Sequence, residues 1–288
     1  GCPYGAYFSS NSSTLPWAKR TGNLTVRPFS VVESILFDEK TGKARGVRVI
    51  DTVSKQPVEF EARIIFVNAS ALNSNLILLN SKSNRFPNGL GNDNGLLGKY
   101  ICFHNYRGSM WGVMPGFEDG YYKVRKPLDC VIPNFRNLGR QETDFLGGYV
   151  IFSGAYRGKP DPDQTEIGTA LKAQQQEPGP WTVYMYMQGE TIPKEHNRVY
   201  LHPDKKDQWG IPLLVTDVGY DDNDDKMVKD FLEQGQIMLE KAGVKDVHTQ
   251  DTHQAPGLDI HEMGGVRMGH DPKTSLLNAF NQLHHCKN

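Results

Sequence analysis

The most informative stretch of the chain is His261-Glu262-Met263-Gly264-Gly265-Val266-Arg267-Met268-Gly269. One imidazole stands at the head of a segment with three glycines. Glycine lets the backbone approach a ligand closely or adopt a positive φ. Histidine suits proton transfer because its ordinary pKa lies near neutrality. The residue types alone leave two interpretations open, a loop with a catalytic histidine or a glycine-rich turn with an ordinary surface histidine.

The composition is that of a globular protein with one large domain or two ordinary ones. The chain has 288 residues, of which 23% are charged and 38% hydrophobic, with a formal net charge of −1. This charge gives no electrostatic reason to expect a nucleic-acid or anionic-membrane partner. Apolar runs are strand-sized and too short to cross a bilayer, so we expect a soluble chain and leave the choice between cytoplasm and periplasm open.

The N-terminal part predicts a β-meander followed by a strand–helix crossing. Residues 29–37, 46–52 and 58–63 alternate as strands and are joined by polar turns. Residues 64–67 form a continuous apolar run, typical of a strand that is covered on both faces. Small residues and a helical pattern follow at 68–79. Such a crossing accepts a phosphate or nucleotide, although Gly-x-Gly-x-x-Gly is absent from it.

The middle of the chain predicts a second sheet. Residues 84–98 are rich in glycine and asparagine and indicate a long loop. Aromatic and β-branched residues are frequent over 106–199, which favours a largely antiparallel sheet. Its aromatic side chains could form a wall for a ring-shaped substrate or simply the core of the sheet. An amphipathic helix is expected from about residue 222 to the glycine at 243.

The cysteines and histidines do not form a recognisable metal-binding pattern. Cys2, Cys102, Cys130 and Cys286 are widely scattered and include no C-x-x-C pair, which disfavours a disulfide framework or a zinc site. We therefore expect no metal site within this chain. One alternative stays open at Cys2, which precedes a proline as iron–sulfur ligands often do, although a buried or free thiol also fits.

The sequence resembles a known family, the glucose–methanol–choline (GMC) flavoprotein oxidoreductases. The spacing His-x-x-Gly-x-x-Arg-x-Gly is similar to the sugar-oxidising branch, which includes pyranose oxidase and bacterial sugar dehydrogenases. Weaker similarities occur in the family's order along the chain, at 1–6, 15–24, 64–70, 97–104 and 271–275. The segment 97–104 resembles the Gly-x-Asn-Leu-x-Asp-His loop but departs from it, because Tyr100 and Phe103 replace the usual Asn and Asp.

The resemblance implies an α/β (α+β) fold with two parts. One is an incomplete FAD-binding Rossmann-like domain that carries the β-meander, and the other is a largely antiparallel six-stranded substrate-binding sheet. The implied boundaries are 1–80 for part of the FAD domain and 81–104 for a connecting loop. They continue with 105–220 for the substrate sheet, 221–260 for a helix and loop packed on it, and 261–288 for the start of the C-terminal FAD and catalytic segment.

The resemblance also implies a cofactor and roles for three residues. FAD is the expected cofactor, with an iron–sulfur cluster at Cys2 as a further option in the full-length protein. Val32 and Ala69 would approach the adenosine part of FAD through their backbones. His261 would be the catalytic base that accepts the hydroxyl proton as hydride leaves for the flavin. Arg267 is expected to be an FAD contact or a structural ion pair.

The function implied is FAD-dependent oxidation of a sugar or polyol hydroxyl to a carbonyl, with electrons passing to an external acceptor. Two alternatives stay open, a GMC enzyme that acts on a sterol or other apolar alcohol, and a carbohydrate-binding module without redox chemistry. By the family's pattern, the dinucleotide fingerprint would precede Gly1 and a second catalytic residue would follow Asn288. We therefore expect a fragment truncated at both ends and inactive by itself.

Overall fold

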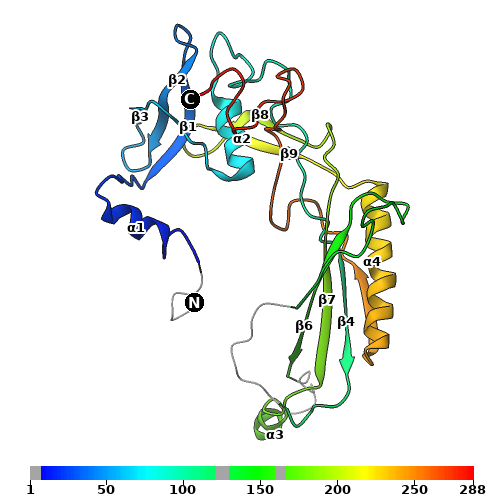
Figure 1. Ribbon diagram of the computed structural model, residues 1–288. Coiled ribbons are helices and arrows are strands. Elements are labelled where there is room, and N and C mark those ends of the chain that lie inside the picture. Colours follow the sequence, from blue (N-terminus) through cyan, green and yellow to red (C-terminus); the bar gives the residue numbers. More distant parts are fainter. Residues whose placement is uncertain (1–7, 121–129, 160–166) are drawn as a thin grey trace.

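The computed structural model describes residues 8–120, 130–159 and 167–288. These residues form two parts, which are visible as separate groups of elements in Figure 1. One part contains helices α1 and α2, strands β1–β3 and the β8–β9 pair. The other part contains the sheet with β4, β6 and β7 and the long helix α4. Both ends of the described chain lie with the first part.

The first part begins with a short helix and the predicted meander. Helix α1 (Thr14–Arg20) is followed by Gly22 at a φ of +71°. Ser13, the residue before the helix, makes no side-chain capping hydrogen bond. Strands β1 (Ser30–Asp38), β2 (Lys43–Asp51) and β3 (Pro57–Glu61) then pair antiparallel in the order β1-β2-β3. The meander prediction is therefore confirmed.

The predicted buried strand at residues 64–67 is wrong. This segment is not a strand, and the side chains of Ile64 and Phe66 are 62% and 81% exposed. A strand covered on both faces needs neighbouring strands for its N–H and C=O groups. Within the described part of the chain, Ile65 N–H finds the Asn288 carbonyl at 2.7 Å instead of a sheet. An apolar run without neighbouring strands cannot form the predicted element.

Helix α2 (Ser70–Asn80) joins the meander to the rest of the first part. Its buried side chains, Ile77, Leu78 and Leu79, pack in one apolar cluster with β1 and β2 and with residues near the C-terminus. Strands β8 (Arg198–Lys206) and β9 (Pro212–Asp217) form an antiparallel pair that also packs on α2. Residues from four distant stretches of sequence thus share one core.

The second part is an antiparallel sheet with the strand order β10-β4-β7-β6-β5. The aromatic block therefore forms the predicted antiparallel sheet, with five strands among the described residues where the resemblance implies six. Helix α3 lies in the same part of the chain. Its elements are β4 (Gly108–Met114), β5 (Cys130–Ile132), β6 (Tyr149–Arg157), α3 (Gly168–Gln174), β7 (Trp181–Gly189) and β10 (Lys245–Asp251).

Helix α4 (Asp222–Lys241) covers one face of this sheet. Met227, Phe231 and Leu239 are at most 1% exposed and pack in the sheet's core cluster. Asp221 accepts from the backbone of the first turn while the Asp224 side chain accepts from the backbone of Asp221, which is a complete capping box. Among the residues that the structure describes, no helix lies on the opposite face of the sheet in Figure 1. The predicted apolar stripe of this helix is confirmed as core packing.

None of the helices that the structure describes combines the length and apolar character needed to cross a bilayer.

Candidate active site

Two loops that are far apart in sequence lie side by side as a short antiparallel pair. Cys102 and Met263 exchange two backbone hydrogen bonds, each of 3.0 Å. Nearby, Gly98 N–H donates to the Gly265 carbonyl at 2.8 Å, and Gly265 N–H donates to the Lys99 carbonyl at 2.9 Å. The glycine-rich motif is therefore fixed along residues 98–104 and is not an isolated turn.

Glycine is required at two positions of the motif by close approach as well as by φ. Gly264 has a φ of +92°, and a Cβ there would lie 2.0 Å from the Tyr100 carbonyl oxygen. Gly265 has a φ of +78°, and a Cβ there would lie 2.2 Å from the Asn75 amide of α2. Any larger residue would push the motif away from the loop and the helix.

The antiparallel register places two histidines opposite each other. His104 follows Cys102 by two residues and His261 precedes Met263 by two, so they face each other across the pair. His104 Nε2 lies 2.9 Å from His261 Nδ1. The ring centroids are 5.1 Å apart with the planes at 80°. The centroid separation exceeds the N–N distance by about two ring radii, so the nitrogens point at each other nearly head-on.

His261 itself has an unusual backbone. Its φ is +66°, the left-handed region that residues with a Cβ seldom adopt. Such strain persists only where surrounding contacts enforce it, and it is concentrated at functional sites. Here the enforcing contacts are the Cys102–Met263 bonds on one side and the imidazole of His104 on the other. The side chain of this residue is on the exposed surface.

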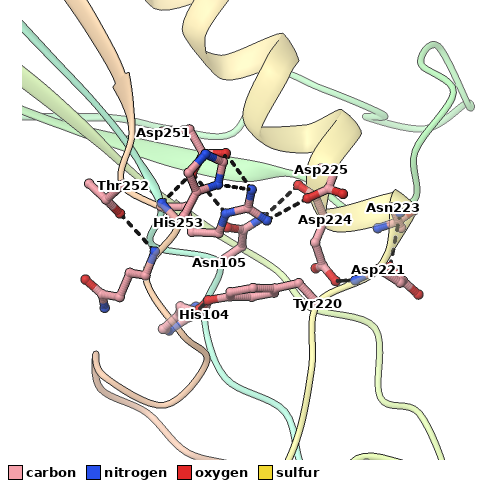
Figure 2. Close-up of polar contacts among 12 residues, drawn as sticks. His104, Asn105, Tyr220, Asp221, Asn223, Asp224, Asp225, Asp251, Thr252 and His253 are labelled. Atoms are coloured by element: carbon pink, nitrogen blue, oxygen red, sulfur yellow. Dashed lines mark hydrogen bonds and ion pairs between the residues drawn. The ribbon is translucent and has the colours of Figure 1, made fainter.

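The loop that carries His104 is held from behind by the sheet and by α4. Asn105 exchanges backbone hydrogen bonds of 2.9 and 3.0 Å with Gly189 at the end of β7. Tyr220 donates its hydroxyl to the His104 carbonyl at 3.2 Å, an arrangement that Figure 2 shows beside the start of α4. Burial raises the pKa of Tyr220 to about 12, so this hydroxyl keeps its proton and remains a donor.

A buried arginine ties the same loop to α4 and β10. Arg107 donates to Asp251 at 3.0 Å and to Asp225 at 2.6 Å, and its guanidinium lies 5.2 Å from the centre of the Tyr220 ring. Its hydrogen bonds to the Asp251 carboxylate raise the pKa of Arg107 despite its burial. Burial alone would raise the pKa of Asp251, but its bonds from Arg107 and from the backbone of His253 lower it below the ordinary value.

Aromatic rings cover the sheet face that lies away from α4. The ring of Tyr186 stacks on Phe152, with centroids 5.2 Å apart and an interplanar angle of 8°, and on Tyr184 at 6.3 Å and 6°. These three side chains are half-buried, whereas Met185 and Met187, which alternate with them, belong to the core on the α4 side. The stacked rings thus form a partly open face, as a wall for a ring-shaped substrate would, and are not core side chains.

The aromatic face extends toward the paired histidines. Tyr106, two residues after His104, makes an edge contact with Tyr186 at 5.2 Å between centroids. Gln188, next on the same face of β7, donates to the Asp259 carboxylate at 3.3 Å. Asp259 lies two residues before His261, so the sheet face and the histidine loop are continuous.

A cavity of about 940 Å³ lies on the other side of the motif, between the meander, α2 and the C-terminal segment. Its volume is within the range of small-molecule and cofactor sites, roughly 300–1,000 Å³. Its lining includes Ser70, Ser74, Asn75 and Gly264 but not His261. The start of α2 has neither a side-chain cap nor an acidic residue in its first turn, and Asn75 Oδ1 is buried without a hydrogen-bond partner. Free helix N–H groups and an unpartnered oxygen fit a ligand with anionic and polar groups, such as FAD.

The residues predicted for FAD lie in the first part of the chain. Ala69 is the residue immediately before α2, between Asn68 and Ser70, which both line the cavity. Val32 lies on β1 at the exposed side of the meander, opposite Val49, and is outside the cavity lining. Their contacts with a cofactor stay predictions.

Other predicted positions have different outcomes. Arg267 lies over the ring of Tyr100 at 4.7 Å, a cation–π contact that neither expectation for it included. Cys2 lies outside the described residues, so its role as an iron–sulfur ligand stays a prediction. His104 was missed as a site residue, although it ends the loop that carries part of the family resemblance. The available signal was its match to the final histidine of the Gly-x-Asn-Leu-x-Asp-His loop.

Comparison with known proteins agrees with the geometry. A family model described as GMC oxidoreductase matches residues 1–105, and a second model with the same description matches residues 193–288. The two matched ranges contain both loops of the histidine pair and the cavity-lining helix α2. The intervening residues carry most of the aromatic sheet.

Several known enzymes are similar over nearly the whole chain. A 2-methyl-1,2-propanediol dehydrogenase of Mycolicibacterium austroafricanum is 29% identical, with 98% of this chain and 51% of the relative covered. A 6'''-hydroxyparomomycin C oxidase of Streptomyces lividus is 26% identical over 94% and 46%. The fructose dehydrogenase large subunit of Gluconobacter japonicus is 23% identical over 98% and 51%. The chain thus spans about half the length of these relatives.

Among solved structures, a formate oxidase of Aspergillus oryzae RIB40 that was studied for its FAD modification has the same fold. The TM-score is 0.62 at 13% identity, with 94% of this chain and 56% of the oxidase covered. At this identity the likeness concerns the fold alone.

Proposed function

Because this chain belongs to the GMC oxidoreductase family, we propose that the protein oxidises a hydroxyl group of a sugar or polyol to a carbonyl, with FAD as cofactor and His261 as base. The observation that carries the proposal is the geometry of His261. Backbone hydrogen bonds between residues 98–104 and the motif fix the loop of His261, and His261 Nδ1 lies 2.9 Å from His104 Nε2, so its imidazole is held at the point where two distant loops meet.

The oxidation removes two groups from the alcohol, a hydride from the carbon and a proton from the hydroxyl. When bound, FAD supplies the acceptor for the hydride, which takes the carbon–hydrogen bonding electrons of the alcohol. The hydroxyl proton then needs a base, because a protonated carbonyl is a poor product. His261 would accept that proton and form an imidazolium. General-base assistance of this kind contributes about 10²–10⁴-fold in rate.

The residues that would hold FAD line the cavity beside the motif. Ser70 and Ser74 of α2 offer hydroxyl groups, and the N–H groups at the start of that helix favour an anionic group. Asn75 Oδ1 is a buried acceptor without a partner. Ala69, beside the cavity lining, and Val32, which lies on β1 outside that lining, are proposed to contact the adenosine part through their backbones.

The aromatic sheet face supports a sugar or polyol as substrate. Stacked half-buried rings offer flat apolar surface at low conformational cost, and Tyr hydroxyls add hydrogen-bonding groups at its edge. Relatives of the chain are named for 2-methyl-1,2-propanediol, hydroxyparomomycin and fructose. Electrons would then pass to an external acceptor, which we leave unassigned.

A substrate panel tests the proposed class. Full-length protein loaded with FAD is mixed anaerobically with sugars, with small diols and with a sterol, and the loss of oxidised-flavin absorbance is followed. We expect the sugars or the diols to reduce the bound flavin and the sterol to leave it oxidised. Reduction by the sterol alone would replace the proposal with an enzyme for apolar alcohols. Binding of a sugar without any reduction would indicate the binding module.

A further inference from the structure

The imidazole of His104 is part of a hydrogen-bond chain that ends on His261. His104 Nδ1 lies 3.3 Å from the Gly189 carbonyl oxygen, and His104 Nε2 lies 2.9 Å from His261 Nδ1. We infer that His104 is a positioning residue, which fixes His261 as the tautomer with its proton on Nδ1 and leaves Nε2 free to accept the substrate's hydroxyl proton. This inference rests on the proposed role of His261 as base.

The direction of the chain follows from the carbonyl at its far end. A carbonyl oxygen only accepts hydrogen bonds, so the nitrogen of His104 that faces Gly189 must carry a proton. The Gly189 oxygen has two lone pairs, of which one accepts from the backbone N–H of Asn105 at 2.9 Å. A neutral imidazole carries one proton, so Nε2 of His104 is then an acceptor. It can accept only from His261 Nδ1–H.

The opposite arrangement is unfavourable. If His261 were the acceptor, a neutral His104 would carry its proton on Nε2. Its bare Nδ1 would then face the Gly189 oxygen at 3.3 Å, with two lone pairs opposed. The near head-on contact between the rings, at a centroid distance of 5.1 Å, fits a directional N–H···N bond and not a stacking contact.

The same contact would assist the proton transfer itself. When His261 accepts the hydroxyl proton on Nε2, its ring becomes positive and its Nδ1–H becomes a stronger donor. His104 Nε2 accepts that bond at 2.9 Å and stabilises the charge. An orienting group of this kind acts on the base without touching the substrate, as the third member of a catalytic triad does. The loop that bears it is fixed by Tyr220 and by Gly189, so the acceptor is held in place.

A pair of variants of similar size tests the acceptor. His104→Gln can present a side-chain oxygen where Nε2 lies, whereas His104→Met cannot accept a strong hydrogen bond. We expect His104→Met to slow flavin reduction in the FAD-loaded full-length protein about 10- to 100-fold, the usual cost of losing a group that orients a functional residue. His104→Gln should recover most of that rate. The substrate KM and the bound FAD should change little in either variant.

Equal losses in both variants, or a change in KM alone, would overturn the inference in favour of a structural role. Loss of FAD from His104→Met with full activity per bound FAD would do the same. The tautomer is read directly from ¹⁵N-labelled histidine by two-bond proton–nitrogen spectra, with His261→Ala used for assignment. A proton on Nδ1 of His261 is expected, and a proton on Nε2 would contradict the inference.

The outcomes separate this inference from the proposed function. If His261→Ala is inactive and His104→Met is as fast as the parent, His261 remains the base and the role of His104 is rejected. If His261→Ala retains the parent rate, the proposed function fails first, whatever His104 does.

Discussion

At the scale of single residues, Gly264 shows how closely the motif is fitted to its neighbours. Gly243, after α4, has the same φ of +92° but open space around its Cβ position, whereas a Cβ on Gly264 would collide with the Tyr100 carbonyl at 2.0 Å. The two glycines therefore separate the cost of backbone strain from the cost of collision.

We predict different losses of stability for alanine at these two positions. Gly243→Ala should lower the free energy of unfolding by about 1–2 kcal/mol, the usual cost of a left-handed alanine. Gly264→Ala should cost about 1–3 kcal/mol more and reduce activity, because the motif must move away from the loop. Thermal unfolding and flavin-reduction rates of the two variants measure both effects. Equal stability losses would show that the Tyr100 carbonyl moves away from the added Cβ at little cost in free energy.

The sequence was informative about His261 and its glycines but not about His104. A histidine before closely spaced glycines is a local pattern, so a single sequence contains it. The contact between His104 and His261 joins residues 157 positions apart and depends on the register of one isolated bridge, Cys102 with Met263. No periodicity or spacing in the sequence encodes that register.

At the scale of elements, β7 separates a core face from an aromatic face. Met185 is 7% exposed on the α4 side, and Tyr184 is half-buried on the other. We predict that Tyr184→Leu raises the KM for a sugar several-fold with little change in stability, because it removes part of the stacking surface. Met185→Ala should instead destabilise the protein by about 2–5 kcal/mol and leave KM unchanged. Steady-state kinetics and thermal unfolding test the pair, and the reverse pattern would move the substrate away from this face.

Arg107, the residue directly before β4, joins the start of that strand to β10 and α4 through its bonds to Asp251 and Asp225. Its side chain is 8% exposed. We predict that Arg107→Met destabilises the protein by about 1–3 kcal/mol, because the half-buried carboxylate of Asp251 loses its charged partner. Arg140→Met is the control. Its side chain is 83% exposed and paired with Glu142, so its loss should cost about 0–1 kcal/mol.

The ion pair between Arg107 and Asp251 makes the stability of the folded protein depend on pH. The pKa of Asp251 is lower in the folded protein than its ordinary value of 3.8, so its contribution is complete above that value and is lost as pH falls through the lowered pKa. We predict that the parent loses stability below about pH 4 more steeply than Arg107→Met does. Urea unfolding at several pH values measures the slopes. Parallel slopes would show that other carboxylates dominate the acid response.

The elements differ in how well sequence predicts them. The meander and α4 were predictable because alternation and a helical stripe are local signals of burial. The strand expected at 64–67 was not, because an apolar run becomes a strand only where other strands pair with it. The strand order was also hidden, since β10 joins the sheet edge from beyond α4 while β8 and β9 pack on α2.

At the scale of the whole molecule, the chain brings together two surfaces that meet at the motif. The cavity between the meander, α2 and the C-terminal segment touches the motif at Gly264 and Val266. The aromatic sheet face approaches it from the other side, through Gln188 and Asp259. The motif therefore lies between the cavity proposed to hold FAD and the face proposed to bind the substrate. From the sequence the aromatic wall was one of two interpretations, and the fold supplies the connection between the two surfaces through residues 261–266.

The most direct test of this account is the rate of flavin reduction in His261→Ala. Full-length FAD-loaded protein is mixed anaerobically with a reducing sugar or diol, and the rate is compared with the parent and with His253→Ala. The control residue also has a positive φ, +49°, but lies outside the motif. The account predicts a fall of about 10²–10⁴-fold for His261→Ala with FAD still bound, and a near-parental rate for His253→Ala. A rate for His261→Ala within a few-fold of the parent would contradict the central claim.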